Sequence, residues 1–502
     1  MTPRQAYERL EERFDRVNRV RESLQVLGWD RATMMPDGGV EARKGQMSAL
    51  ERHARELVRA PQVGDWLAEA EEAADEELDT WERANLREMR RERLAKTAVP
   101  LELAEAWLER GVECRSVWRQ ARHDDDFDRL KPHLAEVIEL TRQIGDARAD
   151  ALELTRYDAL VDRYAPGLTG QKIDEVFGDL ADELPTIIDE ALEAQRQAPD
   201  PEWPDAPMTA DAQHALAESL MGALGFDFEH GRLDTSPHGF CGGHPQDVRI
   251  TTRWDREDFR EGIYCVLHET GHAMYTRQLP DDWFRQPIGR ARGMVVHESQ
   301  SLLVEQFAGR TRSFCEFAAP LFDEHFDGQP DGAFEPDNLH RMVNRVERGL
   351  IRVEADAVTY PAHVLLRYDI ERDLLSGDLP LDDLPAAWKA AMEEYVGITP
   401  TDDCDGCMQD IHWMDGSFGY FPTYLLGQMT AAQLFSAAED QVDGLGDDLA
   451  AGDFDGLMAW LEENVHRMAS RHDADTLLEE ATDAPLSSRP LVEHLRARRA
   501  RG

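Results

Sequence analysis

The sequence predicts a mostly helical, all-α protein with one small β-sheet at a cleft, and three observations support this prediction. From residue 1 to about 200, Arg, Glu, Ala and Leu dominate the composition, and all four favour helices. The apolar residues in this part recur three and four positions apart, as on one face of an α-helix. One strand is indicated at 247–254, where Val248, Ile250 and Thr252 alternate with more polar residues. After this strand the helical periodicity returns and continues towards the C-terminus.

The N-terminal helices are separated by short breaks that contain proline or glycine. These breaks fall at Pro36–Gly38, Pro61, Pro100, Pro166–Gly167 and the proline-rich stretch 198–207. The last of these is the best candidate for a subdomain linker or a surface loop. We therefore expect a single domain over 1–502, with a helical part at about 1–200 and a second part, about 208–502, that carries the reactive residues.

The chain is strongly acidic. It has 100 Asp and Glu against 55 Lys and Arg, a formal net charge of −45, and only five of its cations are lysines. Such a surface repels itself at ordinary ionic strength, whereas molar salt screens the repulsion. We therefore predict a protein from a halophilic microbe. The charge also argues against nucleic acid or an anionic membrane as a partner.

Several features predict a cytoplasmic protein. Six cysteines in 502 residues give no disulfide framework, which suits a reducing compartment. The N-terminus is a charged amphipathic segment without an apolar signal. The uncharged stretch 416–438 contains proline and glycine, so we expect a buried loop and helix there, with no membrane span.

The segment "YCVLHETGHAMYT", residues 264–276, carries the clearest chemistry. His268 and His272 are four residues apart and lie on one face of the predicted helix, and Glu269 follows the first histidine. This is the H-E-x-x-H arrangement of zinc hydrolases, in which both imidazoles bind the metal and the glutamate acts as general base. The alternative is a pair of histidines at the edge of the core.

A catalytic zinc usually has a third protein ligand. The chain has Gln278 and Tyr275 where the metzincin pattern needs histidine and glycine, which excludes that class. Glu298, on the next predicted helix, is the natural third ligand, although it could be a surface glutamate. Glu305 shares its face about 10 Å further along, so one of the two could bind the metal but hardly both. His297 points to a different side of that helix.

Several motifs together resemble the carboxypeptidase Taq family of metallocarboxypeptidases, from about residue 5 to 500. They are "DVRIT" at 247–251, "HETGH" at 268–272, "HESQS" at 297–301, "IRVEAD" at 351–356, "GCMQDIHW" at 406–413 and "GSFGYFPTY" at 416–424. One departure is visible at 238–240, where the family usually has His-Pro-Phe and this chain has His-Gly-Phe. The local backbone there can differ, because glycine lacks the fixed φ of proline.

The resemblance implies a zincin-like metallopeptidase fold with a deep active-site groove, assembled as a homodimer. It implies removal of single C-terminal residues from peptides, with broad side-chain preference and poor action near proline. Zinc (Zn²⁺) is the expected metal, and cobalt (Co²⁺) is a possible substitute.

The expected mechanism assigns a role to each candidate residue. His268, His272 and Glu298 would bind zinc, and Glu269 would take a proton from the attacking water and pass it to the leaving amine. The oxyanion needs a hydrogen-bond donor. Tyr420 is the first choice, His238 the second and Tyr424 a weaker rival, although Tyr420 could equally be a packed aromatic.

An exopeptidase must also recognise the terminal carboxylate of its substrate, and the planar fork of arginine does this well. Arg352 is the preferred candidate and Arg249 the second. Either could be a structural partner instead, Arg352 for Asp356 and Arg249 for Asp247.

The remaining expectations concern the surroundings of the site. Gln409 and His412 would line the cleft, and the strand at 247–254 could pair with an extended peptide. We interpret the isolated Cys404 and Cys407 as structural or incidental. Two other functions remain open, an endo-acting zinc oligopeptidase and an inactive peptide-binding scaffold.

Overall fold

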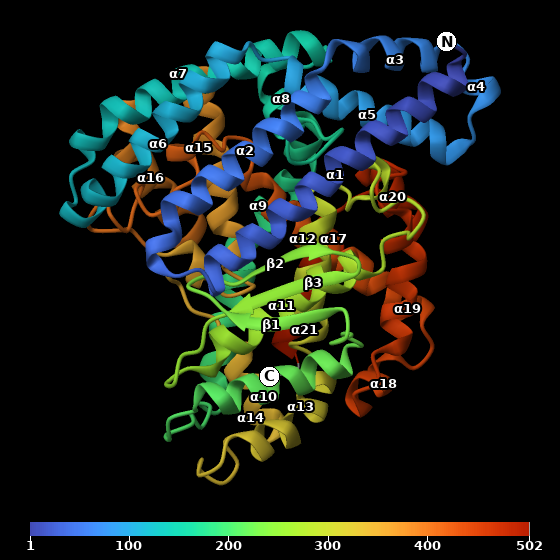
Figure 1. Ribbon diagram of the computed structural model, residues 1–502. Coiled ribbons are helices and arrows are strands. Elements are labelled where there is room, and N and C mark those ends of the chain that lie inside the picture. Colours follow the sequence, from blue (N-terminus) through green and yellow to red (C-terminus); the bar gives the residue numbers. More distant parts are fainter. Residues whose placement is uncertain (501–502) are drawn as a thin grey trace. The chain divides into compact units, whose positions relative to one another are not determined.

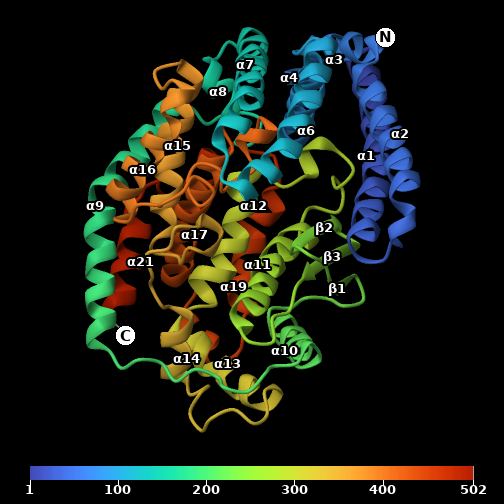
Figure 2. The same ribbon diagram turned by 90° about the vertical axis from the view of Figure 1, so that its left-hand side faces the viewer.

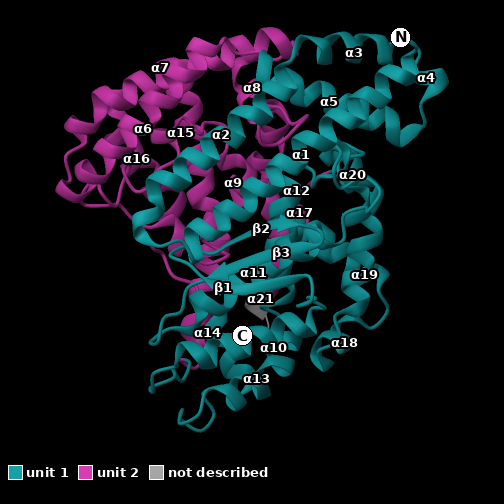
Figure 3. Cartoon of the chain, in the orientation of Figure 1, with its two compact units in different colours: residues 1–97, 201–343, 431–485 teal, residues 98–200, 344–430, 486–502 magenta. Residues whose placement is uncertain are grey.

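The computed structural model describes residues 1–500, which form a mostly helical structure with one three-stranded sheet, as predicted (Figures 1 and 2). The chain divides into two compact units, each built from three segments (Figure 3). Unit 1 comprises 1–97, 201–343 and 431–485, and unit 2 comprises 98–200, 344–430 and 486–502. One crossing between the units falls within the proline-rich stretch 198–207. The single domain over 1–502 stays a prediction.

Unit 1 begins with a group of helices around a shared apolar core. They are α1 (Pro3–Thr33), α2 (Val40–Arg59), α3 (Pro61–Glu71), α4 (Ala74–Glu77) and α5 (Thr80–Thr97). A capping box starts α1, because the Thr2 hydroxyl accepts from Gln5 N and the Gln5 side chain accepts from Thr2 N. Tyr7, Leu10 and Phe14 of α1 are fully buried in this core. The apolar spacing read from the sequence therefore marks the packed face of the helix.

The sheet of unit 1 contains β1 (Gly231–Thr235), β2 (Phe240–His244) and β3 (Asp247–Thr252) in the order β1-β3-β2. β3 pairs with β1 in parallel and with β2 in antiparallel orientation. The predicted strand is thus real, but it ends at Thr252 and lies in the centre of the sheet. The expectation that it pairs with an extended peptide is wrong, because the ladders to β1 and β2 occupy both of its edges.

The rest of unit 1 is helical. It comprises α10 (Ala210–Ala223), α11 (Phe259–Arg277), α12 (Gly293–Leu302), a π-helix (Leu303–Ala308), α13 (Arg312–His325), α14 (Pro336–Val343), α18 (Leu445–Ala451), α19 (Asp455–Asn464) and α20 (Ala474–Thr482). Helix α11 packs against β2, β3 and α12, and Figures 1 and 2 show it beside the sheet. Val248 and Ile250 of β3 are buried. The sheet and α12 therefore hold α11 from two sides.

Within its described residues, unit 2 contains helices and connecting loops but no strand. It contains α6 (Leu101–Asp124), α7 (Phe127–Leu152), α8 (Arg156–Val161), α9 (Gly170–Gln197), α15 (Tyr360–Ser376), α16 (Leu384–Ala391), a π-helical turn (Met392–Val396), α21 (Arg489–Ala500) and the start of α17 (Phe421–Gln441), which continues into unit 1. Helices α6 and α7 pack together and turn at Asp125, which has a left-handed backbone. α15 is buried along most of its length.

Short 3₁₀ turns connect several of these elements. They are Asp37–Gly39, Pro287–Gly289, Arg352–Glu354, Leu381–Asp383, Trp413–Asp415 and His466–Met468. The uncharged stretch 416–438 forms the expected loop followed by a buried helix, α17. None of the helices within residues 1–500 combines the length and the apolar character needed to cross a membrane.

Candidate functional site

Helix α11 presents the two histidines of the H-E-x-x-H segment on one face. The helix begins after Asp258, whose carboxylate accepts from Arg260 N at 2.9 Å. The centroids of the His268 and His272 rings are 4.9 Å apart. His272 is buried and His268 is partly buried, because α11 is covered on most of its surface.

The close approach of α12 to α11 depends on Gly271, the glycine between the histidines. A Cβ at this position would overlap the carbonyl oxygen of Gln300 and lie 2.7 Å from Ser301 Cα. Because glycine has no Cβ, the two backbones pack directly. This packing brings the Glu298 carboxylate to 3.9 Å from His268 Nε2 and 3.6 Å from His272 Nε2.

The ligand atoms of His268, His272 and Glu298 all lie within 4.8 Å of one another. Two imidazole nitrogens and one carboxylate oxygen are a donor set that catalytic zinc takes from proteins. Burial and the neighbouring His297 and His268 rings lower the pKa of His272, which keeps this imidazole neutral and able to bind a metal. The residues present therefore fit a metal ion.

Glu305 has a role that the sequence did not reveal. It lies in the π-helix after α12, and its carboxylate accepts from His268 Nδ1 at 3.0 Å and from Arg310 Nη2 at 3.0 Å. A carboxylate bonded to Nδ1 fixes the tautomer of the imidazole and leaves Nε2 for a metal. π-helical turns occur often at functional sites. Such a turn adds one residue to the helical turn, and the apolar spacing of the sequence does not reveal this addition. The ring of His297 packs against His272 at 4.3 Å between centroids.

Glu269 lies beside the histidines in a nearly water-free position. Burial raises its pKa to about 7, although the His268 imidazolium and a backbone hydrogen bond at Cys241 act in the opposite direction. Cys241 belongs to β2, so an edge strand of the sheet and α11 together hold this carboxylate. A group that changes charge near neutral pH suits a general base.

The departure at 238–240 has a steric reason. A Cβ at Gly239 would overlap the thiol of Cys265 and lie 3.9 Å from Glu269 Oε1. The thiol on α11 therefore fills the space that a larger residue in the loop would need. His238 is exposed in this loop, and its carbonyl accepts from the Ser236 hydroxyl.

Arg249 is largely engaged within unit 1. Its Nε and Nη2 each donate to Asp247 at 2.8 Å, and its guanidinium lies 4.2 Å from the centroid of the Trp29 ring. This is the structural pairing with Asp247 that the sequence left open.

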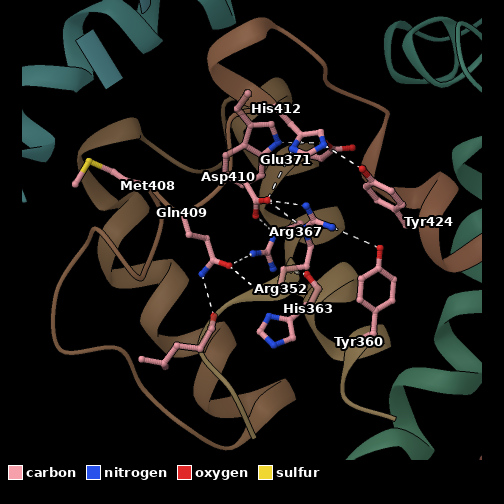
Figure 4. A network of polar contacts seen from close by, with 12 residues as sticks. Arg352, Tyr360, His363, Arg367, Glu371, Met408, Gln409, Asp410, His412 and Tyr424 are labelled. Atoms are coloured by element: carbon pink, nitrogen blue, oxygen red, sulfur yellow. Dashed lines mark hydrogen bonds and ion pairs between the residues drawn. The ribbon is translucent and has the colours of Figure 1, made fainter. Parts of the chain in front are cut away.

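Unit 2 holds a second buried polar group, which we call the arginine cluster: Arg352, Arg367, Gln409 and Asp410 (Figure 4). Arg352 is 5% exposed. Its Nε and Nη2 donate to Asp410 Oδ1 at 3.1 and 2.9 Å, while its Nη1 lies 3.5 Å from the Tyr360 hydroxyl. The alternative pairing of Arg352 with Asp356 does not form, because the Asp356 carboxylate accepts from backbone N–H groups at 347, 358 and 359.

Arg367, on α15, and Asp410 are the two members of the cluster that the sequence did not predict. Arg367 is fully buried and donates to Asp410 Oδ2 at 2.6 Å, to Gln409 Oε1 at 2.7 Å and to the carbonyl of His363 at 2.6 Å. Its guanidinium also lies 4.6 Å from the centroid of the Trp388 ring. α15 reads as an ordinary helix in sequence, so no local pattern identifies this residue.

Both the oxygen and the nitrogen of the Gln409 side-chain amide form hydrogen bonds. The oxygen also accepts from Arg352 N at 2.9 Å, and the nitrogen donates to the carbonyls of Leu350 and Asp405 at 3.0 and 2.8 Å. Gln409 therefore joins the backbone around 350–352 to the segment around 405–409.

His412 and Tyr420 belong to an aromatic group within unit 2. The His412 ring lies 4.5 Å from that of Phe421, and its Nε2 lies 3.3 Å from the Tyr424 hydroxyl. Tyr420 is half-buried, with its ring 4.9 Å from Tyr164 and 5.2 Å from Tyr424. Burial and the nearby Arg352 lower the pKa of His412 to about 4.

The loop that carries Tyr420 is tied to α15 through Glu371. This buried carboxylate accepts from the Tyr157 hydroxyl at 2.6 Å, Trp413 Nε1 at 3.2 Å and Gly419 N at 3.1 Å. Burial raises its pKa to about 7, against the effect of these donors. Arg367 and Glu371 are four residues apart, so one face of α15 supports both candidate substrate-binding segments.

The cysteines at 404 and 407 are free thiols. Cys404 lies near Asp125 and Asp402, with ligand atoms within 4.8 Å of one another, but this group is at the surface and its members bond among themselves. Cys407 is buried.

Comparison with known proteins assigns the chain to a family. Residues 9–499 match the family described as carboxypeptidase Taq (M32) metallopeptidase. The chain belongs to that family. Thermostable carboxypeptidase 1 of Thermus thermophilus is 38% identical, over 99% of this chain and 98% of the relative. Carboxypeptidase 1 of Bacillus subtilis is 31% identical, over 96% of this chain and 95% of the relative.

Solved structures of the family agree with the fold. Metallocarboxypeptidase 1 of Trypanosoma cruzi superimposes with a TM-score of 0.96 at 39% identity, covering 98% of this chain and 99% of that one. The M32 carboxypeptidase of Deinococcus radiodurans R1 gives 0.94 at 31% identity and covers 99% of both chains. The predictions of a zincin-like metallopeptidase fold and of an enzyme of the metallocarboxypeptidase class are confirmed. Family membership also implies a metal ion, whose identity stays a prediction.

Proposed function

We propose that this protein is a zinc-dependent carboxypeptidase that removes single C-terminal residues from peptides with broad side-chain preference. The observation that carries the proposal is the convergence of His268, His272 and Glu298, with the buried carboxylate of Glu269 beside them. The names of the relatives, all carboxypeptidases, support the same activity.

His268, His272 and Glu298 would hold one Zn²⁺ per chain, with Co²⁺ as a possible substitute. When bound, the metal supplies a Lewis acid and lowers the pKa of a bound water to about 7. Glu305 holds His268 in the tautomer that leaves Nε2 available. A solved structure of the Pyrococcus furiosus carboxypeptidase is named "Apo-Mg", so metal analysis is part of the test.

Glu269 takes the proton of the attacking water and later donates it to the leaving amine. Its buried position supports this role, because a carboxylate with a raised pKa both accepts and returns a proton near neutral pH. Its position in sequence directly after His268 places it next to the ligand pair without making it a ligand.

A hydroxyl or imidazole must donate to the oxyanion that forms on the scissile carbonyl. Tyr420 is our first candidate, because Glu371 fixes its loop through Gly419 and Trp413. His238 is the second candidate and is exposed in the loop that packs near Glu269. Tyr424 is the weakest of the three, because its hydroxyl already lies near His412.

Arg352 would bind the terminal carboxylate of the substrate. It shares its ion-pair partner Asp410 with Arg367, and its Nη1 has no acceptor closer than the Tyr360 hydroxyl among the bonds of the described residues. Arg249 is the weaker candidate, because Asp247 and Trp29 engage its guanidinium. Gln409 would hold Arg352 in place, and His412 would line the binding site.

The test compares a free-acid peptide with the same peptide amidated at its C-terminus. Since a charge-assisted hydrogen bond contributes roughly 1.5–3 kcal/mol, Arg352→Ala should lower kcat/KM for the free acid by about 10- to 150-fold. It should hardly change the weak cleavage of the amide. Arg352→Lys should rescue only part, because an ammonium cannot form the bidentate fork. Arg249→Ala tests the second candidate, and a collapse of the ratio between the two substrates in that variant would assign terminal recognition to Arg249.

Other outcomes identify the alternatives. Efficient internal cleavage of blocked peptides would indicate an endo-acting oligopeptidase. A metal-loaded protein that binds peptides without hydrolysing them would indicate a scaffold. If both substrates slow equally in Arg352→Ala, this arginine supports the fold and our account of terminal recognition is wrong.

We also propose that the protein acts as a homodimer in the salt-rich cytoplasm of a halophilic microbe, without nucleic acid or membrane partners. The net charge of −45 supports the salt requirement and disfavours polyanionic partners. Light scattering after size-exclusion chromatography in molar KCl would measure the assembly, and a monomeric mass would overturn the dimer.

A further inference from the structure

We propose that Arg367 is a positioning residue for substrate binding: it neutralises Asp410, so that Arg352 keeps its positive charge for the substrate carboxylate. This inference rests on the proposed role of Arg352 and extends it to a residue outside the family motifs seen in the sequence. Arg367 itself does not need to touch the substrate. It acts through Asp410 and Gln409.

The arginine cluster carries an unbalanced charge. Two guanidinium groups contact one carboxylate, Arg352 at Oδ1 and Arg367 at Oδ2 of Asp410. The three groups together therefore carry one excess positive charge in a buried place. Isolated buried charge is costly, so such a cluster favours one further anion.

The surrounding titratable groups do not remove this excess. His363 is fully buried, and burial together with Arg367 and Arg352 lowers its pKa to about 3. His412 is likewise neutral at pH 7, with its pKa lowered to about 4 by burial and Arg352. The carboxylate of Glu371 accepts from Tyr157, Trp413 and Gly419, so its oxygens are engaged away from the guanidiniums.

Asp410 and a substrate carboxylate would compete for Arg352. Without Arg367, Asp410 and Arg352 would form a neutral pair. A substrate carboxylate would then meet a guanidinium whose charge is already matched, and it would be repelled by Asp410 at short range in a medium of low dielectric constant. With Arg367 present, each oxygen of Asp410 is bonded to a different guanidinium, and Arg352 can bind a second anion.

The orientation of the Arg352 guanidinium supports the same role. Arg352 directs Nε and Nη2 at Asp410, so its Nη1 edge, near the Tyr360 hydroxyl, is the part best placed for another acceptor (Figure 4). Arg367 supports this orientation twice. It holds Asp410 from the opposite oxygen, and it shares the Gln409 oxygen with Arg352 N.

A double-mutant cycle that neutralises first Arg367 and then Asp410 tests the proposal on the metal-loaded enzyme with the paired free-acid and amidated peptides. Arg367→Met should raise KM for the free acid by about 10-fold or more, with kcat changed much less, because an anion site of this kind contributes at the level of a charge-assisted hydrogen bond. The amide should be unaffected. Combining Arg367→Met with Asp410→Asn restores the net charge of the arginine cluster to +1. The KM of this double variant for the free acid should therefore return most of the way to the wild-type value.

Two controls separate charge from packing. Arg148→Met removes another buried, ion-paired arginine of unit 2, the partner of Asp162. It should lower the Tm without changing the ratio between the two substrates. Arg367→Lys keeps the charge and should be closer to wild type than Arg367→Met.

The outcomes are distinct. The proposal is overturned if the double variant binds the free acid as poorly as Arg367→Met, or if Arg367→Met slows both peptides equally. If Arg352→Ala leaves the ratio between the substrates unchanged, terminal recognition by Arg352 fails, and the role of Arg367 fails with it. If Arg352→Ala collapses the ratio and Arg367→Met does not alter it, only the role of Arg367 is wrong.

Discussion

The candidate metal centre and the arginine cluster are both buried polar sites, but each has an excess of charge of the opposite sign. On α11 and α12, the carboxylates of Glu269, Glu298 and Glu305 gather around two imidazoles. In unit 2, two guanidiniums share Asp410. The first arrangement favours a cation and the second an anion, since buried charges are stable only when paired. The sign of the unmatched charge therefore indicates which kind of ion each candidate site would bind.

The largest expected effect tests the chemistry of the metal centre. Glu269→Gln should keep the metal, because Glu269 is not among the three proposed ligands, and should lower kcat by on the order of 10²–10⁴, the usual contribution of a positioned base. Steady-state kinetics and metal analysis on the same preparation measure both quantities. Near-native turnover would show that the proton moves through another group.

A smaller effect is expected from the residue behind the metal centre. Glu305→Gln should weaken metal binding by about 10- to 100-fold, because the amide no longer fixes the His268 tautomer as a carboxylate does. Competition with a chelator measures the metal Kd. Glu261→Gln is the matched control, since Glu261 is on the same helix as His268 but exposed. Unchanged affinity in Glu305→Gln would mean that Arg310 is the true reason for its position.

The corresponding change in the arginine cluster should leave the metal alone. Gln409→Ala removes the acceptor shared by Arg352 N and Arg367, and a buried donor left without a partner costs about 1–3 kcal/mol. We expect a lower Tm and a higher KM for free-acid peptides, with native metal content. Loss of metal in this variant would show that Gln409 also supports metal binding.

The smallest expected effect is the dependence of the Tm on salt, to which each charged surface residue contributes little. With a net charge of −45, the Tm should rise steadily as KCl increases from about 0.1 M to beyond 1 M, where the Debye length falls from about 10 to 3 Å. Differential scanning calorimetry across this range is the measurement. A flat profile would show that the acidic surface is tolerated without screening, and the halophilic origin would lose its support.

The pH dependence follows from the buried base. In the metal-free protein the pKa of Glu269 is about 7 because burial disfavours its charge. A nearby metal cation favours the carboxylate, so the acid limb of kcat/KM in the loaded enzyme should lie below pH 7. Activity should rise with pH through this limb, since a general base acts in its deprotonated form. A limb above pH 7 would exclude Glu269 as its origin.

Patterns between neighbouring residues are sufficient to predict the local elements of this protein. The helices, the strand at β3 and the pair of histidines follow from periodicities of 3.6 and 2 and from one four-residue spacing, which neighbouring residues create without help from distant segments. Glu298 could also be proposed as the third metal ligand, because it lies on the next helix after α11.

Contacts between distant segments became visible only in the folded chain. The partner of Arg352 is Asp410 rather than Asp356, Arg367 enters the cluster from α15, and Glu305 reaches His268 through a π-helical turn. β3 is central rather than at an edge, because β1 and β2 pair with it on both sides. Such contacts depend on packing and charge balance between helices that are far apart in the chain. The spacing of residues along the sequence does not show which of these helices lie close together in space.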